Sequence, residues 1–517
     1  MKKTILFLAL AVLGTAEAAG WKYKWPVIVP EVQEKTFKAD VQVKIEDGVV
    51  VSVSCADGAK MSGWVAAKFA AWFGVKAKVQ DVAFAGTPFP NAGGYSLTAK
   101  AGTLALGAQT AKAGALALGA QTAEGVRYAM STLRQLAQPQ RGTLTVKGWE
   151  VPELTIRDWP EISFRGLHLC AFPELSLVSI EHQIRMAAYY KYNYVVLEPW
   201  GTYRSEKYPW YGFRNGKLTT AECRRLAKIA ADLGVKLIPE LNVFGHATAA
   251  RVCAGKNAIL YHAPEYAPLF EPGNNGWNWC LSNPETRKVQ EGMLEEMYEA
   301  FGRPGYVHLG CDEANGPSCS ACCAVPYWEV VSAHVRALNE KAAKLGARPM
   351  VWHDMLLARN DARWQGFYQN GAADAEKLLM SLPKSLVVCD WYYGSPRKDG
   401  AFPTLDYFQK QMKFTTLTCP WNKTVGIRAQ CAYARTHSLD GVLQTMWHHY
   451  TGPTVRAIYT VGAAAAWSAK ANQEQGTGKF SDYSTHWRQT ANDTPGGDAY
   501  EEQGWYSDQV RSECPWN

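Results

Sequence analysis

The sequence of 517 residues lacks several features that mark whole classes of proteins. It has no collagen-like or proline-rich period and an ordinary apolar content of 47%, which excludes a disordered or fibrous protein. It also has little excess charge. Its 54 basic and 47 acidic residues give a net charge of +7, which is too diffuse over this length to favour a nucleic-acid partner. Beyond the N-terminus no apolar run approaches about 20 residues, so we expect no membrane span.

The first 18 residues carry the pattern of an export signal. Two lysines precede an apolar run from Ile5 to Leu13, and small residues follow up to Ala18. This pattern predicts a secretory signal peptide over residues 1–18, cleaved after Ala18. The mature protein is therefore expected to be secreted or periplasmic.

Thirteen cysteines are an odd number for a chain that we expect to be exported. Cys319, Cys322 and Cys323 form the one local group. Their spacing favours disulfides or buried thiols over a structural metal, because no second compact pair stands at zinc-finger spacing. Cys253 and Cys280 flank a loop and could pair with each other. We predict no metal and no cofactor, and the disulfide connectivity stays open.

Residues 19–152 are predicted to form a small α+β domain. The octapeptide that begins at Leu104 recurs twelve residues later at Leu116, and two copies are too few for a solenoid. We therefore expect a local duplication that lengthens a hairpin or loop. Alternating and helical apolar spacing predicts two strands, at 41–45 and 49–53, and two helices, at 63–73 and 125–136.

Short apolar runs alternate with helical segments over residues 153–470. Strands are predicted at 163–169, 194–197, 236–239, 306–310, 350–353, 386–389, 414–417 and 441–446. The predicted helices between and after them include 180–190, 220–233, 284–301, 329–344 and 454–469. Eight strands that alternate with helices predict a (β/α)8 TIM barrel, an α/β fold, with a doubly wound open sheet as the alternative. The polar tail over 471–517 has no predicted function.

Ionisable and aromatic residues recur at the carboxyl ends of the predicted strands, where a barrel carries its chemistry. A saccharide site needs this mixture, because aromatic rings stack on sugar rings and charged groups bind hydroxyls and transfer protons. The strand ends, from the second to the eighth, read Glu198-Pro-Trp200, Glu240-Leu-Asn242, Asp312-Glu313, Trp352-His-Asp354, Asp390-Trp-Tyr-Tyr393, Pro420-Trp421 and Trp447-His-His449.

The adjacent acids Asp312 and Glu313 carry the chemical argument. Neighbouring residues at a strand end point in different directions. They are poorly placed to face each other at about 5–5.5 Å as the nucleophile and acid of an ordinary retaining glycosidase. One carboxyl group can instead protonate a leaving oxygen while the other polarises a nucleophile that the substrate supplies.

Several segments, in a fixed order, carry the motifs of one enzyme family. Residues 308–313 read H-L-G-C-D-E, residues 239–246 read P-E-L-N-V-F-G-H, and residues 164–166 read F-R-G. Residues 281–286 contain L-S-N-P, and the helix predicted at 125–136 has the spacing G-x-x-Y-A-x-x-T-L-x-Q-L. Together they resemble glycoside hydrolase family 20, the β-N-acetylhexosaminidases.

The resemblance implies an exo-acting retaining glycoside hydrolase that works by substrate-assisted catalysis. It would release terminal β-linked N-acetylhexosamine, GlcNAc or GalNAc in plain or modified form, through an oxazolinium intermediate. Asp312 would orient the 2-acetamido group, and Glu313 would act first as general acid and then as general base. The expected partner is then a glycan. We expect no nucleic-acid partner and no membrane span. The oligomeric state stays open.

The same resemblance implies residues that bind the sugar. Arg165 would hold the O3 and O4 hydroxyls, and His246 and His308 would support the carboxylates by hydrogen bonding. The other implied binding residues are Trp352 and Trp421 at the acetamido pocket, Trp447 under the ring, Tyr392 or Tyr393 as donor to the acetamido carbonyl, Asp390 in the same sixth-strand frame, and His449.

The sequence departs from the family pattern at several of these positions. Asn242 stands for an aspartate, Cys311 stands for the second glycine of the acid motif, and His449 stands for a glutamate. An imidazole in place of a carboxylate acceptor suggests a sugar that is altered at O4 or O6, or one that carries charge or sulfate. The departures also keep a catalytically weak carbohydrate-binding relative open as an alternative. An oxazoline-forming glycosidase of a neighbouring family is a third.

Overall fold

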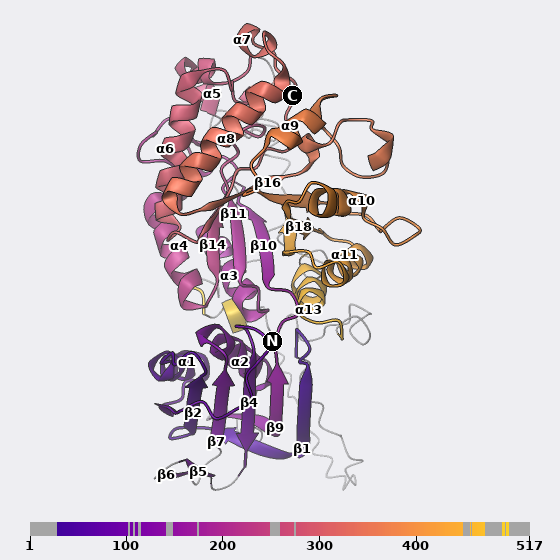
Figure 1. Ribbon diagram of the computed structural model, residues 1–517. Coiled ribbons are helices and arrows are strands. Elements are labelled where there is room, and N and C mark those ends of the chain that lie inside the picture. Colours follow the sequence, from indigo (N-terminus) through magenta and orange to yellow (C-terminus); the bar gives the residue numbers. More distant parts are fainter. Residues whose placement is uncertain are drawn as a thin grey trace, which may run out of the picture.

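The computed structural model describes residues 28–101, 104–106, 109–111, 115–140, 148–172, 175–248, 259–272, 276–447, 455, 457–470, 489–491 and 493–495. Two units follow one another along the chain, an N-terminal α+β domain and a barrel (Figure 1). The predicted signal peptide and most of the predicted tail lie outside the described residues. Among the described helices, none has the length and apolar character needed to cross a membrane.

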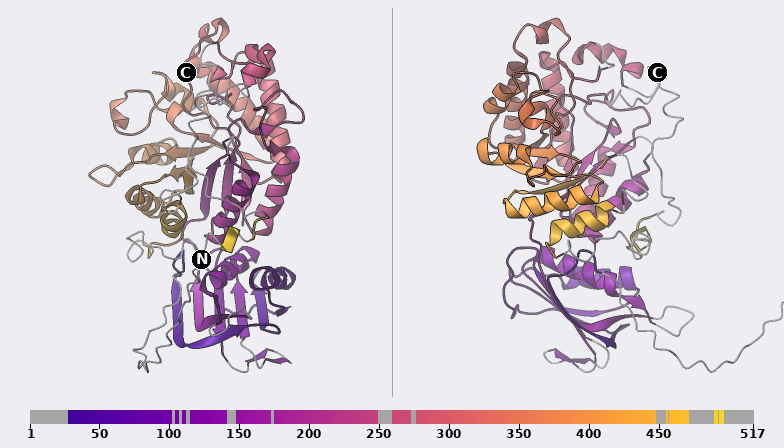
Figure 2. Two further views of the ribbon diagram at one scale, coloured as in Figure 1. Left: turned by 180° about the vertical axis from the view of Figure 1, so that it is seen from behind. Right: turned by 90° about the vertical axis from the view of Figure 1, so that its right-hand side faces the viewer.

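The N-terminal domain is a seven-stranded mixed sheet with helices on one face, in the order β1-β9-β4-β7-β2-β3 with β8 beside β9. In Figure 2 its helices lie between this sheet and the barrel. Buried Val51, Phe69 and Leu133 join the sheet to both helices in one apolar core. The elements are β1 (Glu34–Ile45), β2 (Val50–Cys55), α1 (Ser62–Phe73), β3 (Lys78–Asp81), β4 (Tyr95–Lys100), β7 (Ala115–Ala120), α2 (Ala123–Leu136), β8 (Gln138–Pro139) and β9 (Trp149–Asp158).

The two copies of the repeated octapeptide take different places. The first copy forms a separate antiparallel hairpin of β5 (Leu104–Leu106) and β6 (Gln109–Ala111). The second copy begins within β7, which lies between β4 and β2 in the main sheet. The first copy therefore adds a hairpin to the chain, in line with the expected duplication that lengthens a hairpin or loop.

The border between the two units lies after β9. This strand pairs with β1 and β4 along most of its length and ends at Asp158, so it belongs to the N-terminal sheet. The first barrel strand begins at Phe164. The predicted border at 152/153 divides β9, and the structure places the end of the domain at Asp158 instead.

The second unit is a barrel of eight parallel strands in the order β14-β11-β10-β19-β18-β17-β16-β15. A parallel bridge between Glu240 and His308 joins the two ends of this order. Because neighbours in sequence are neighbours in a closed ring, the (β/α)8 prediction is confirmed over an open doubly wound sheet. The strands are β10 (Phe164–Cys170), β11 (Tyr194–Glu198), β14 (Lys236–Pro239), β15 (Tyr306–His308), β16 (Arg348–Trp352), β17 (Val387–Trp391), β18 (Thr415–Cys419) and β19 (Gly441–Met446).

Helices cover the outside of the barrel (Figure 1). Their ends follow local chemistry: the Asn283 side chain caps the first turn of α6, and Gly346 ends α8 with a φ of 79°. The long helices are α3 (Leu177–Tyr189), α4 (Thr220–Asp232), α6 (Pro284–Ala300), α8 (Tyr327–Leu345) and α11 (Thr424–Thr436). The shorter elements are β12 (Tyr203–Arg204), β13 (Leu218–Thr219), α5 (Ile259–His262), η3 (Pro264–Leu269), α7 (Ser320–Cys323), η5 (Asp354–Leu356), η6 (Ala362–Trp364), α9 (Ala375–Ser381), α10 (Pro403–Asp406), η7 (Tyr407–Gln411), η8 (Ile458–Gly462) and α13 (Ala463–Trp467).

The N-terminal domain contacts the barrel through a buried polar cluster. Lys191, fully buried, places Nζ 3.2 Å from an Asp158 carboxylate oxygen and donates to the Tyr95 hydroxyl at 2.8 Å. Trp467 donates to the other Asp158 oxygen at 3.0 Å. Lys191 lies just before β11 begins, so this domain covers the amino ends of the strands. The carboxyl ends are left for a site.

Candidate active site

A pocket of about 260 Å³ opens at the carboxyl ends of the barrel strands. Its wall brings together six of the predicted site residues, two acids, one histidine and three aromatic residues. It also contains five residues that were not predicted to bind. The lining consists of Cys170, Phe172, Trp200, His246, Trp277, Asp312, Glu313, Trp391, Tyr393, Trp421 and Trp447.

The acid pair stands in a tightly bent loop after β15. Gly310, Cys311 and Glu313 all have positive φ, of 62°, 77° and 44°. This conformation is rare for residues with a Cβ atom. The bend turns the two carboxyl groups differently: the side chain of Asp312 is 9% exposed and that of Glu313 is 36% exposed. Asp312 is thus held in the wall while Glu313 reaches the opening.

His246 lies against both acids. Its Nε2 is 3.3 Å from Asp312 Oδ2 and 3.6 Å from Glu313 Oε2, and its ring packs between Trp200 and Trp277. Burial lowers the pKa of His246, but the Asp312 charge and hydrogen bond outweigh burial, so the pKa is raised. This contact fits the predicted support of the carboxylates.

The second oxygen of Asp312 has a different environment. Oδ1 is buried and has no hydrogen-bond partner among the described residues. Buried acceptors in folded proteins are normally satisfied, by protein, water or ligand. An acceptor of this kind in a pocket wall suits a substrate group that donates an N–H.

The backbone of Glu313 is fixed from two sides. Its N–H donates to Asp354 Oδ2 at 3.0 Å, and its carbonyl accepts from Trp277 Nε1 at 2.9 Å. Two hydrogen bonds to buried partners restrict the loop, so the carboxyl group is aimed by the backbone and not by its own contacts alone.

Asp354 is a fully buried carboxylate that the sequence did not assign to the site. Besides Glu313 it accepts from Asn370 at 2.8 Å and from Trp391 Nε1 at 3.2 Å. Burial, followed by the charge of Asp312, raises the pKa of Asp354 to about 6. Asp354 therefore positions one acid and one aromatic wall of the pocket.

Aromatic side chains form much of the wall. Trp447 Nε1 donates to the Tyr393 hydroxyl at 2.6 Å, and the Tyr393 ring lies 5.1 Å from Trp421 and 5.4 Å from Trp391. Faces of this kind pack on the apolar face of a sugar. Tyr393, Trp421 and Trp447 therefore all line the pocket, and their predicted contacts with a sugar stay a prediction.

A buried charge network lies beneath the pocket. His168 Nε2 is 3.0 Å from Glu240 and 3.3 Å from Glu198, and His308 Nδ1 is 3.3 Å from Glu240. Burial lowers the pKa values of both histidines, but other contacts outweigh burial and raise them: Glu198 and Glu240 at His168, and Glu240 with Cys389 at His308. Trp352 donates to Glu240 at 2.9 Å.

Two predicted site residues thus belong to this network and not to the pocket wall. His308 contacts Glu240, where support of the acid pair was expected, and the fully buried Trp352 lies below Trp447 at a ring distance of 5.6 Å. Alternation along a strand explains the difference: side chains of β15 and β16 that point inward fill the barrel one layer below the rim.

His168, Glu198 and Glu240 have the composition of a metal site, with one ligand atom each within 4.8 Å of the others. The protein already satisfies much of this group. Glu198 accepts from Asn242 at 2.7 Å, and Glu240 accepts from Trp352 and lies beside both histidines. The arrangement is that of a balanced set of buried ion pairs, which needs no cation.

Arg165 is placed far from the pocket, so the expected contact with sugar hydroxyls does not fit the structure. Its guanidinium donates to the Tyr128 hydroxyl at 2.6 Å and the Ile162 carbonyl at 2.7 Å, and lies 5.0 Å from the Trp467 ring. Arg165 is the second residue of β10, and Cys170 is the last. Five residues of strand separate them by about 16 Å.

Asp390 and Tyr392 also point away from the pocket. Asp390 is buried 3.4 Å from His353, outside the barrel interior, because it alternates with the inward residues on β17. Tyr392 stacks on Phe367 and donates to the Ser395 carbonyl at 3.1 Å. Of the two tyrosines that were predicted as donors, only Tyr393 lines the pocket.

His448 and His449 lie outside the described residues. The idea that a histidine at this position selects a sugar altered at O4 or O6 stays a prediction.

The sequence carried a signal for most of the unassigned site residues. Trp200, Asp354 and Trp391 follow or end strands, so their position marked them as rim residues even though no role was given. Trp277 belongs to the long segment between β14 and α6 and carries no such signal. Its role depends on how that segment folds over the loop of the acid pair.

Two protein-family models match the chain. The model "Glycosyl hydrolase family 20, catalytic domain" matches residues 171–459, more than half of the chain. The model "Glycosyl hydrolase family 20, domain 2" matches residues 26–159. The two ranges agree with the barrel and the N-terminal domain.

Curated relatives are similar over part of the chain. A β-hexosaminidase of Vibrio furnissii is 26% identical over 274 residues, which are 44% of this chain and 42% of that protein. A β-hexosaminidase of Akkermansia muciniphila is 28% identical over 210 residues, 37% of this chain and 41% of that protein. The chain thus matches about two fifths of the length of these relatives.

Solved structures show the same fold. An exo-β-N-acetylglucosaminidase of Vibrio harveyi in complex with N-acetylglucosamine has a TM-score of 0.62 at 16% identity, over 95% of this chain and 78% of that chain. A β-N-acetylhexosaminidase of Streptomyces coelicolor has a TM-score of 0.60 at 17% identity, over 95% and 98%.

Proposed function

Because the chain belongs to glycosyl hydrolase family 20, we propose that it is an exo-acting, retaining β-N-acetylhexosaminidase. Its substrate is a glycan that ends in a β-linked N-acetylhexosamine. No nucleic acid and no cofactor take part in the reaction that follows.

The arrangement of Asp312 and Glu313 carries the proposal. The two acids are adjacent, and they differ in exposure because the loop turns one into the pocket wall and the other toward the opening. This suits a pair with unlike tasks better than two carboxylates that face each other across a sugar ring. A substrate that brings its own nucleophile needs such a pair.

In the first step the acetamido carbonyl oxygen attacks C1, and the bond from C1 to the leaving oxygen breaks. Glu313 gives its proton to that oxygen. Asp312 accepts a hydrogen bond from the acetamido N–H through the carboxylate oxygen that lacks a protein partner, which stabilises the positive charge of the oxazolinium ion. In the second step Glu313 takes a proton from water, which attacks C1 and restores the acetamido group with net retention.

The aromatic wall binds the sugar ring. Trp447 offers a face at the rim of β19, and the Tyr393 hydroxyl, which accepts from Trp447, keeps a proton to donate to a substrate oxygen. Trp421 and Trp391 close the side of the pocket next to the acetamido group. The pocket is of a size for one terminal residue, which fits an exo-acting enzyme.

The predicted signal peptide supports action outside the cytoplasm. A pocket that accepts the end of a chain suits glycans that the cell meets in its surroundings.

Release of 4-nitrophenol from 4-nitrophenyl N-acetyl-β-glucosaminide tests the proposal. We expect hydrolysis by the full chain, and a fall in kcat/KM of about 10²–10⁴-fold in Glu313→Gln and in Asp312→Asn, as for loss of a general acid–base group. NMR of the first product formed should show the β-anomer.

The matching control is 4-nitrophenyl β-glucoside, which lacks the amide nucleophile and should not be hydrolysed. Equal rates on both substrates, or an inverted product, would contradict the proposal. Binding of N-acetylglucosamine without hydrolysis would instead support the carbohydrate-binding alternative.

A further inference from the structure

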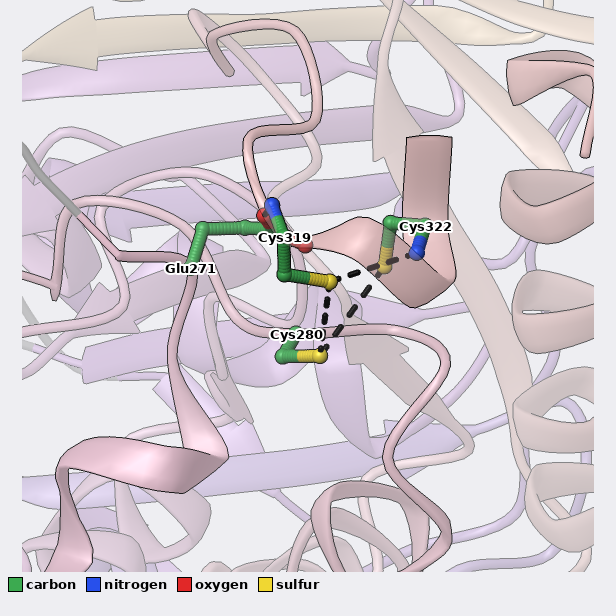
Figure 3. Close-up of side chains that lie close together, drawn as sticks. All are labelled: Glu271, Cys280, Cys319 and Cys322. Atoms are coloured by element: carbon green, nitrogen blue, oxygen red, sulfur yellow. Dashed lines mark hydrogen bonds between the residues drawn. The ribbon is translucent and has the colours of Figure 1, made fainter. Parts of the chain in front are cut away.

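The side chains of three cysteines and one glutamate lie close together (Figure 3). Glu271 and Cys280 come from the segment before α6, and Cys319 and Cys322 come from the start of α7. One ligand atom of each lies within 4.8 Å of the others, and three of the four residues are buried. Only Cys319 and Cys322 are close in sequence, so the group is made by the fold.

The spacing of the sulfur atoms matches that of ligands around one ion. Cys280 Sγ is 3.6 Å from Cys319 Sγ and 3.9 Å from Cys322 Sγ. Zinc–sulfur bonds of about 2.3 Å at tetrahedral angles separate two sulfurs by about 3.8 Å. A disulfide would use only two of the three sulfurs.

Hydrogen bonds orient the four side chains from outside. One oxygen of Glu271 accepts from the backbone N–H groups of Ser318 and Cys319, both at 2.7 Å. The N–H of Cys322 donates to Cys319 Sγ at 3.2 Å, and Cys322 Sγ is 3.1 Å from the Ser282 hydroxyl. Such outer bonds are typical of metal sites, where they fix the ligands before the ion binds.

We propose that Glu271, Cys280, Cys319 and Cys322 bind one structural zinc ion. Three thiolates select a soft or borderline cation over magnesium or calcium, and four protein ligands complete a tetrahedron with no open position. Cys323 is not a ligand, because it is exposed and its sulfur faces the Pro317 carbonyl.

An ion at this position would join two segments of the chain that already contact each other beside the pocket. Trp277, between two ligands in sequence, donates to the Glu313 carbonyl. Asn278 exchanges hydrogen bonds of 2.7 and 3.1 Å with the backbone of Asn315. Zinc would fasten both segments and thereby hold the loop of the acid pair in its strained conformation. This role is independent of which sugar the pocket takes.

Metal content of the full chain tests the site. The protein is produced with zinc in the medium, purified without chelator and analysed by inductively coupled plasma mass spectrometry. We expect about one zinc per chain, at least a tenfold lower content in Cys280→Ser and Cys322→Ser, and an unchanged content in the matched control Cys323→Ser.

A second measurement does not depend on the folding of the variants. Cobalt exchanged into the wild-type chain should show the sulfur-to-cobalt charge-transfer band and the intense visible bands of a tetrahedral thiolate site. Absence of these bands, zinc retained in Cys280→Ser, or a peptide map with Cys280 in a disulfide to Cys319 or Cys322 would each overturn the proposal.

Discussion

The backbone of the acid-pair loop holds Cys311 at a φ of 77°, where a side chain is unfavourable. A residue with a Cβ atom costs about 1–2 kcal/mol in this conformation, and glycine avoids that cost. We expect the free energy of unfolding of Cys311→Gly to be about 1 kcal/mol higher than that of Cys311→Ala. At most positions glycine instead lowers stability relative to alanine. Urea unfolding of the two variants measures the difference. A higher free energy of unfolding for Cys311→Ala than for Cys311→Gly would show that the backbone at this position is not strained.

The pKa of Asp354, raised to about 6, makes stability depend on pH. The ordinary value is 3.8, so the folded state binds this proton more tightly than the unfolded state does. The contribution of Asp354 to the free energy of unfolding is complete below pH 3.8 and is lost as the pH rises through about 6. We expect the free energy of unfolding to fall by about 2–3 kcal/mol over this range through Asp354 alone. Urea unfolding across a pH series, compared with Asp354→Asn, isolates this fall.

The charge of Asp312 is one cause of that raised pKa, which provides a control. In Asp312→Asn the fall with pH should be smaller than in the wild type and should shift to lower pH. Parallel stability curves for the wild type and Asp354→Asn would contradict the assignment.

The ends of β14 and β15 meet at Glu240, which follows one strand and bridges to His308 on the other. Its carboxylate is the shared counter-charge of His168 and His308, and all three are fully or almost fully buried. Glu240→Gln removes the carboxylate counter-charge of buried His308 and one of the two carboxylates beside His168. We therefore expect the free energy of unfolding to fall by about 3–5 kcal/mol. Chemical denaturation measures it.

The exposed Glu299→Gln in α6 is the matched control for this loss. Glu299 pairs with Arg303 at the surface, so its removal should change the free energy of unfolding by about 0.5 kcal/mol at most. Similar losses in the two variants would show that the network beneath the pocket is not tightly coupled to the fold.

Sequence and structure agree closely at the level of the strands. All eight predicted barrel strands are present, because buried parallel strands are short apolar runs that stand out between helical segments. Besides the four-residue helices α5, α7 and α10, the sequence analysis did not name two of the described helices, α9 and α11. The first has seven residues, and neither has a side-chain hydrogen bond that caps its first turn.

The site was predicted less completely than the fold. The sequence identified the strand ends and the acid pair, since their position follows from the fold. It did not show which of two neighbouring side chains faces inward, so Asp390 was assigned in place of Trp391. It also did not show depth, so His308 and Trp352 were placed at the rim when they lie beneath it.

At the level of the whole molecule, Arg165 lies at the contact between the two domains and not in the wall of the pocket. Its bond to Tyr128 connects β10 to α2, and its bond to the Ile162 carbonyl fixes the guanidinium beside β10. We expect Arg165→Met to reduce the free energy of unfolding by about 3 kcal/mol, because buried acceptors lose a charged donor. KM for the nitrophenyl substrate should stay within about twofold.

Tyr128→Phe is the matched variant from the other side of the contact. It removes the hydroxyl that Arg165 binds and should lower stability in the same direction, again with KM unchanged. A tenfold rise in KM in Arg165→Met, without such a rise in Tyr128→Phe, would show that Arg165 contributes to sugar binding.

The N-terminal domain covers the amino ends of the barrel strands, and the pocket opens at the opposite ends. If the protein is attached to a resin or a particle through that domain, the pocket therefore faces the medium. A long or insoluble polymer can then reach the pocket with its chain end without colliding with the support.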